Sequence, residues 1–218
     1  MRRVRLVVFG TLIAVFAARG AVAQTVGGGA VGVSHQAAGA SDLPYLGRGF
    51  GGTAFAVFAT IDRDVRRHVS IGGEVSTAAA ITGDQSQRTS GATNAFESRH
   101  RDTVFSATAK VFAPIGDRMR IAAAGGAGGA WRRTLREGTT ASLFPPASRS
   151  PFSETLSTVV FAYTFGADVT FRLAGRVSIL ALGRIHKLRD DDLQDDGVVR
   201  RGVSSTVYRA AVGAQWHF

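Results

Sequence analysis

Few residues in this sequence have the type and spacing that catalysis or metal binding needs. No two of the five histidines have the spacing of a helical metal site; they are His35, His68, His100, His186 and His217. The sequence has no cysteine, which excludes a disulfide scaffold, a thiolate-bound zinc and thiol catalysis. We therefore expect no catalytic residue, no metal ion and no cofactor.

A cluster of carboxylates is the strongest candidate for ion binding. Residues 190–196 contain five aspartates, and clustered oxygens are the ligands that Ca²⁺ prefers. The segment lacks the spacing of an EF-hand and its closing Glu. A hydrated acidic loop is the alternative interpretation.

Other charged side chains lie within segments that alternate between apolar and polar residues. In 155–172 the apolar face carries Val159, Phe161, Tyr163, Phe165, Val169 and Phe171. Alternation with period two predicts β-strands with one apolar face. The charged strand residues fall on the opposite face, and they are Glu74, Lys110, Arg132, Asp168, Arg184 and Arg209.

The position of these six charges favours a membrane barrel over a soluble barrel or sandwich. A lipid-facing Arg or Lys at the middle of a bilayer costs roughly 2–4 kcal/mol, so such residues belong in the interior. Glu74 and Asp168 could accept hydrogen bonds from guanidinium groups there. We predict an ion-pair network inside the barrel, and separately hydrated side chains near its mouths are the alternative.

The spacing of the alternating segments predicts an all-β chain with eight strands. We place them at 25–36, 49–61, 68–82, 102–113, 119–133, 155–172, 176–188 and 202–218. Short turns at 62–67, 114–118 and 174–175 alternate with long connections at 37–48, 83–101, 134–154 and 189–201. Short turns on one side and long loops on the other are typical of an eight-stranded antiparallel up-and-down transmembrane β-barrel. Small residues are expected inside and large apolar ones outside.

The N-terminal segment resembles a signal for export. Arginines at 2, 3 and 5 precede an apolar run over 6–18, and Ala21-Val22-Ala23 fits a cleavage site. We expect residues 1–23 to be a signal peptide and 24–218 to be the barrel; an uncleaved membrane helix is the alternative. Loss of four arginines lowers the formal net charge from +10 to +6, and export makes nucleic acid an unlikely partner.

The last strand carries the clearest family resemblance. Tyr208, Trp216 and Phe218 share its apolar face. This pattern resembles outer-membrane β-barrel proteins, in which such a strand is read by the barrel-assembly machinery. The whole chain looks like the small eight-stranded group that includes the membrane domain of outer-membrane protein A and the opacity-type proteins. The resemblance implies a place in the cell outer membrane, among outer-membrane lipid and lipopolysaccharide.

Two pairs deserve comparison with enzymes of that membrane. Lipid A deacylases use a His and a Ser two residues apart, as in His68 and Ser70, but the Asn that follows in that family is Ile71 here. The predicted topology also puts this pair on the side away from the outer leaflet. His100 and Asp102 could form the His–Asp pair of an outer-membrane protease, a group that has more strands.

We therefore expect a non-enzymatic barrel with a structural or surface-interaction role, carried by four extracellular loops whose ligand is unknown. A narrow transport channel is the first alternative, because Ala122, Ala124, Gly126 and Gly128 leave space inside. A lipid-modifying enzyme is the second. The outer rim could bind lipopolysaccharide phosphates through its arginines, which are Arg88, Arg99, Arg101, Arg132, Arg133, Arg136 and Arg149.

Overall fold

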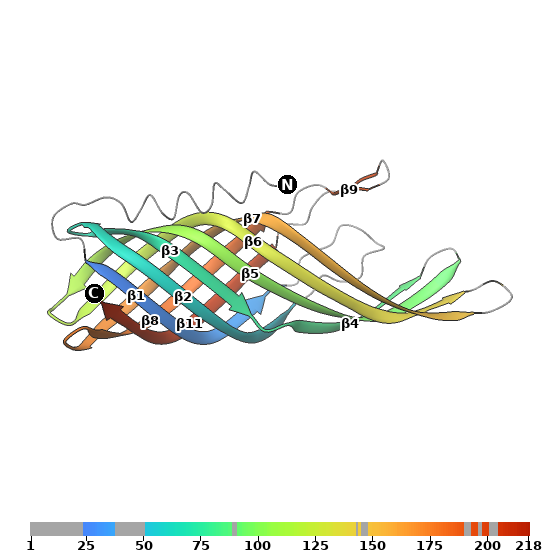
Figure 1. Ribbon diagram of the computed structural model, residues 1–218, viewed down its shortest axis with the longest axis horizontal. Coiled ribbons are helices and arrows are strands. Elements are labelled where there is room, and N and C mark those ends of the chain that lie inside the picture. The colour runs from blue at the N-terminus through green and yellow to red at the C-terminus, as the bar shows by residue number, and fades with distance from the viewer. Residues whose placement is uncertain are drawn as a thin grey trace.

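The computed structural model in Figure 1 describes most of the chain. The described residues are 24–37, 51–88, 91–142, 144, 148–189, 193–195, 198–200 and 205–218. The predicted signal peptide and most of the first long connection lie outside them. No helix in the described part is long and apolar enough to cross a membrane.

Eight strands close into one antiparallel ring. They are β1 (Thr25–Gln36), β2 (Gly52–Arg66), β3 (Val69–Ala78), β5 (Ala92–Ile115), β6 (Met119–Ser142), β7 (Arg149–Ala174), β8 (Val177–Arg189) and β11 (Ser205–His217). Each strand pairs with its neighbours along the chain, β1 pairs with β11, and β3 pairs with β5. This arrangement confirms the predicted eight-stranded barrel.

Three short strands lie outside the ring. The strand β4 (Ile81–Arg88) continues the sheet along the first half of β5, beyond the point where β3 ends. The strands β9 (Leu193–Asp195) and β10 (Val198–Arg200) form a separate two-stranded hairpin.

The two ends of the barrel differ. One end, the turn end, has tight turns at 67–68, 116–118 and 175–176, and a positive φ at Gly116 and Gly175 allows two of them. The strand β1 begins and β11 finishes at this end, where the Phe218 amide donates to the Thr25 carbonyl over 2.9 Å. At the opposite end, the hairpin end, β4 and parts of β5, β6 and β7 extend well beyond the ring (Figure 1).

At the hairpin end the structure shows that two segments predicted to be loops are mostly strand. Most of 83–101 and 134–154 is paired strand, with pairing from Ile81↔His100 to Arg88↔Thr93 and out to Ala141↔Arg149. Outside a membrane both faces of such a ribbon meet water, so its sequence shows no apolar alternation although the backbone continues to pair.

The outward face of the ring carries a continuous apolar belt. Its exposed side chains include Val111 (61%), Val159 (65%), Phe105, Phe165, Phe171, Ile179, Val212 and Trp216. From Ile115 to Phe105 the strand covers about 33 Å, and a tilt of about 40° reduces this to about 25 Å along the barrel axis, the height of a membrane barrel's apolar band.

Glycines allow the strands to approach one another closely on the inward face. A Cβ at Gly128 would lie 1.9 Å from the Phe105 carbonyl oxygen, and one at Gly166 would lie 2.0 Å from that of Gly183. Any side chain at these positions would therefore push neighbouring strands apart.

Large apolar residues also face inward, which corrects the expectation that only small ones do. Phe58, Leu180 and Leu182 pack in one buried cluster with four alanines. Val104, Val160 and Leu188 belong to a second cluster, and Val104 lies further toward the hairpin end along β5 than Lys110. The interior is thus part apolar and part charged.

Candidate functional site

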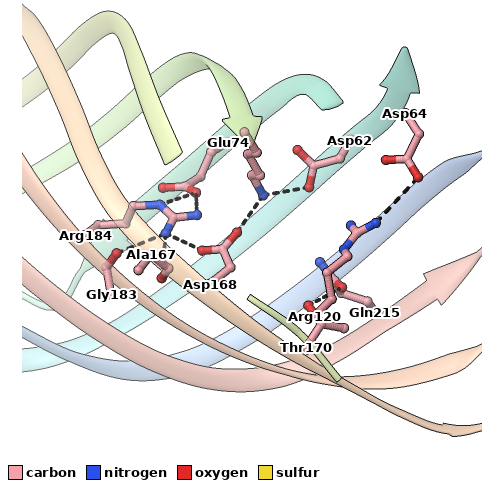
Figure 2. Close-up of polar contacts among 11 residues, drawn as sticks. Asp62, Asp64, Glu74, Arg120, Ala167, Asp168, Thr170, Gly183, Arg184 and Gln215 are labelled. Atoms are coloured by element: carbon pink, nitrogen blue, oxygen red, sulfur yellow. Dashed lines mark hydrogen bonds and ion pairs between the residues drawn. The ribbon is translucent and has the colours of Figure 1, made fainter. Parts of the chain in front are cut away.

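Five charged side chains meet inside the barrel. They come from β2, β3, β5, β7 and β8, and we call them the lumen network: Asp62, Glu74, Lys110, Asp168 and Arg184. All are at most 4% exposed. Figure 2 shows the Arg184 guanidinium pointing toward Glu74 and Asp168.

Arg184 forms one half of the network. Its Nε lies 2.8 Å from Glu74 Oε2, and its Nη1 donates to Asp168 Oδ1. The same Nη1 donates to the carbonyls of Ala167 and Gly183 over 3.3 and 3.0 Å. Gly166 makes this position possible, since a Cβ there would lie 3.0 Å from Nη1.

Lys110 forms the other half. Its Nζ lies 2.7 Å from Asp62 Oδ2 and 2.9 Å from Asp168 Oδ2 (Figure 2). Asp168 therefore joins the two cations. A buried ion pair is tolerated when its desolvation is offset by several charged hydrogen bonds, as here.

A second charged cluster lies toward the hairpin end. Asp102 Oδ1 is 3.2 Å from Arg132 Nε and 3.1 Å from His100 Nε2. Arg132 also donates through Nη2 to Ser205 Oγ over 2.6 Å. This cluster crosses from β5 and β6 to β11.

Arg209 lies between these groups without an acidic side chain of its own among the described residues. Its Nη1 donates to Ser76 Oγ, its Nη2 donates to the Asp102 carbonyl over 3.1 Å, and its Nε donates to Ser34 Oγ over 3.3 Å. Close to it in the interior, Thr164 Oγ1 lies 3.0 Å from His186 Nδ1 and 3.2 Å from Ser106 Oγ.

At the turn end a weaker pair lies near the mouth. Arg120 Nη1 is 3.5 Å from Asp64 Oδ2 (Figure 2). The Arg120 guanidinium also stacks 3.9 Å from the centre of the Phe112 ring. Thr170 donates to Gln215 across the same region over 3.3 Å.

The six charged residues predicted to face the interior do not form one network; they belong to three different sets of contacts. Glu74, Lys110, Asp168 and Arg184 join the lumen network, Arg132 joins the Asp102 cluster, and Arg209 bonds mainly to hydroxyls. Arg132 therefore points inward and is not part of the outer rim.

Sequence reasoning missed Asp62 and Asp102 as interior partners. Asp62 lies two residues beyond the inward Thr60, and Asp102 lies two before the inward Val104. Asp62 is one residue past the expected strand 49–61, whereas Asp102 is the first residue of the expected strand 102–113. Continuing the inward alternation to these two positions would have found both. Charged residues are not confined to the interior, since Lys187, Arg101 and Arg133 face outward beyond the belt.

The two candidate enzyme pairs are poorly arranged for a substrate. His68 is exposed in a turn, where its Nδ1 lies 3.2 Å from the Phe112 carbonyl oxygen, whereas Ser70 is fully buried. His100 and Asp102 face each other inside the wall, and Arg132 occupies the same carboxylate oxygen.

Two sequence candidates remain: the aromatic residues of the last strand and the acidic segment 190–196. Tyr208, Trp216 and Phe218 lie on the outward face, between 46% and 71% exposed. Most of the acidic segment 190–196 lies outside the described residues, and the described ones hold no cluster of three potential metal ligands.

Comparison with known proteins finds similarity at the level of fold. No protein-family model and no curated protein matches the sequence. A major outer membrane protein from Thermus thermophilus is 13% identical with a TM-score of 0.49, covering 90% of this chain and 100% of its own. Neisserial surface protein A is 10% identical with a TM-score of 0.48, and the match covers 89% of this chain and 97% of that protein. The attachment invasion locus protein Ail of Yersinia pestis is 14% identical with a TM-score of 0.47, and the match covers 90% of this chain and 99% of that protein.

The outer surface decides where such a barrel belongs. A closed antiparallel ring leaves no unpaired strand edge within its belt, and the belt exposes side chains as large as Phe105 and Phe165 to the surroundings. In water this much contiguous apolar surface would aggregate, whereas in a bilayer it is solvated by lipid. The protein is therefore an eight-stranded transmembrane β-barrel.

Proposed function

We propose that this barrel is a non-enzymatic, non-conducting membrane anchor that presents its hairpin end as a surface for interaction outside the cell. The observation that carries the proposal is the combination of a filled interior with a sheet, β4-β5-β6-β7, that extends beyond the belt. A barrel of eight strands is just wide enough for side chains to fill.

The contents of the interior argue against a pore. The lumen network connects β2, β3 and β5 to β7 and β8. The apolar cluster around Phe58 and Leu180 includes residues of β1, β2, β8 and β11. Together these groups involve most of the wall, and the Asp102 cluster adds a second charged layer toward the hairpin end.

The hairpin end supplies the interaction surface. Phe96 and Phe152 pack edge to face at 6.0 Å, and Arg136 lies over the Phe96 ring at 5.8 Å. Such aromatic and cationic contacts stiffen a hairpin that no barrel wall supports, which suits a surface held out for a partner.

Single-channel recording in planar bilayers tests the proposal. The refolded protein should give no discrete current steps, while a porin in the same bilayers shows that the assay detects conductance. Ohmic steps that scale with salt concentration would contradict the proposal and favour the narrow channel.

A further inference from the structure

A groove of about 240 Å³ lies on the outer wall of the barrel, where the apolar belt ends on the side of the hairpin end. It is lined by Thr77 of β3, Arg101 and Thr103 of β5, and Trp131 and Arg133 of β6. The lumen network and the Asp102 cluster lie on the inner side of the same strands, so this groove is a separate feature.

The strand register brings these side chains together. Arg101 is directly opposite Arg133, and Thr103 is directly opposite Trp131. Thr77 is opposite Thr103, and their hydroxyl oxygens are 2.9 Å apart. The groove is therefore a patch of neighbouring positions on three adjacent strands, built on paired backbone.

The groove carries two positive charges that face each other. Like charges directly opposite each other on one face destabilise a strand pair. Within the described part of the chain neither Arg101 nor Arg133 has a carboxylate partner, and Glu97, further along β5, pairs with Arg99 at 2.7 Å. Two guanidiniums side by side form a site for an anion with several oxygens.

The position of the groove along the barrel axis indicates what kind of anion it would bind. One outward position toward the turn end lie the exposed belt residues Phe105, Val75 and Phe161, whose apolar surface suits acyl chains. Trp131 is at the boundary, with its Nε1 donating to Ser157 Oγ over 2.6 Å. Trp is typical of the level at which lipid headgroups begin.

We propose that Arg101, Arg133 and Trp131 form a binding site for a phosphate group of a phosphorylated outer-leaflet glycolipid, whose acyl chains lie along the belt below. The inference rests on the proposed function, because it needs the hairpin end to face outward. The two guanidiniums bind the phosphate oxygens, and the indole packs against the sugar–acyl boundary. Of the two paired threonine hydroxyls, one donates to the other, and the second donates to a sugar or phosphate oxygen.

Tryptophan fluorescence can measure binding at this groove directly. The chain has two tryptophans, so a Trp216→Phe background leaves Trp131 as the only indole reporter. The protein in detergent micelles is titrated with bisphosphorylated lipid A, with the same lipid after removal of its phosphates, and with inorganic phosphate.

We expect bisphosphorylated lipid A to change the emission at a concentration at least about tenfold lower than the dephosphorylated lipid, because charge-assisted bonds are lost with the phosphates. Equal responses to both lipids would overturn the site. A full response to inorganic phosphate alone at equal concentration would overturn the lipid assignment.

The double variant Arg101→Gln/Arg133→Gln tests the residues. Its lipid A binding should weaken at least about tenfold, whereas Lys187→Gln, a charge change on the outward face of β8 and away from the groove, should stay within twofold. Heat-modifiable gel mobility shows that each variant is folded. Unchanged binding by the folded double variant would overturn the proposal, while current steps from the wild type would contradict only the anchor function.

Discussion

At the scale of single residues, the interior charges are held by several partners each. Arg184 contacts two carboxylates and two carbonyls, and Lys110 contacts two carboxylates. Removing one partner therefore leaves a charge that cannot reach water, which costs more than the pair itself contributes.

Glu74→Gln should lower the stability of the barrel by about 3 kcal/mol, because the buried Arg184 loses one of its two carboxylates. The measurement is the temperature at which the folded band converts to the unfolded band in heat-modifiable gel mobility. Glu97→Gln is the matched control, since its partner Arg99 is exposed, and it should leave that temperature unchanged. Equal temperatures for wild type and Glu74→Gln would show that the network does not stabilise the fold.

Gly166→Ala should destabilise the barrel by about 1–3 kcal/mol, since overpacking strains neighbouring atoms. The added Cβ would meet the Gly183 carbonyl oxygen at 2.0 Å and displace Arg184. Gly125→Ala is the control, because nothing lies within 4 Å of its added Cβ. Urea unfolding in micelles compares the two, and similar midpoints would contradict the predicted close approach.

At the scale of elements, the barrel strands could be predicted well and the hairpin end could not. The strand at 25–36 matches β1, and each turn overlaps a predicted short connection and ends at most one residue beyond it. Lipid on one side and lumen on the other impose alternation there. Beyond the belt that constraint ends, so the polar segment around Thr139 carried no strand signal although it pairs with Pro151.

The partners in the interior could be predicted only in part, for a related reason. The inward face of each strand is visible in the sequence, but Glu74 and Arg184 are 110 residues apart and meet across the lumen. Which inward charges meet depends on the stagger of all eight strands around the ring. Asp62 and Asp102 were missed because each lies at the limit of a predicted strand.

Shortening the β6–β7 hairpin should leave the barrel intact. Replacing 138–152 by Asn-Gly would join the facing residues Glu137 and Ser153 through a two-residue turn. We expect the heat-modifiable transition to stay at the wild-type temperature, because the removed residues lie beyond the belt. A chain that no longer gives a folded band would show that the extension is part of the folding unit.

At the scale of the whole molecule, the orientation in the membrane can be measured simply. The chain has no cysteine, so a single introduced one is the only thiol. On intact cells a membrane-impermeant maleimide should label Thr139→Cys at the hairpin end and spare Asp117→Cys in a turn at the other end. Lysed cells should give equal labelling of both. The reverse pattern on intact cells would invert the proposed orientation.

The buried charges also affect how the unfolded chain would cross the inner membrane. In β8 the run Val177–Leu182 is apolar apart from Ser178, and it is followed by Gly183 and Arg184. An arginine in the middle of a helix costs about 2.5–3.5 kcal/mol when the inner membrane's insertion machinery samples it. On the proposed route to the cell surface, Arg184, which connects the carboxylates of the lumen network, would therefore also oppose insertion of this strand as a helix in the first membrane that the chain crosses.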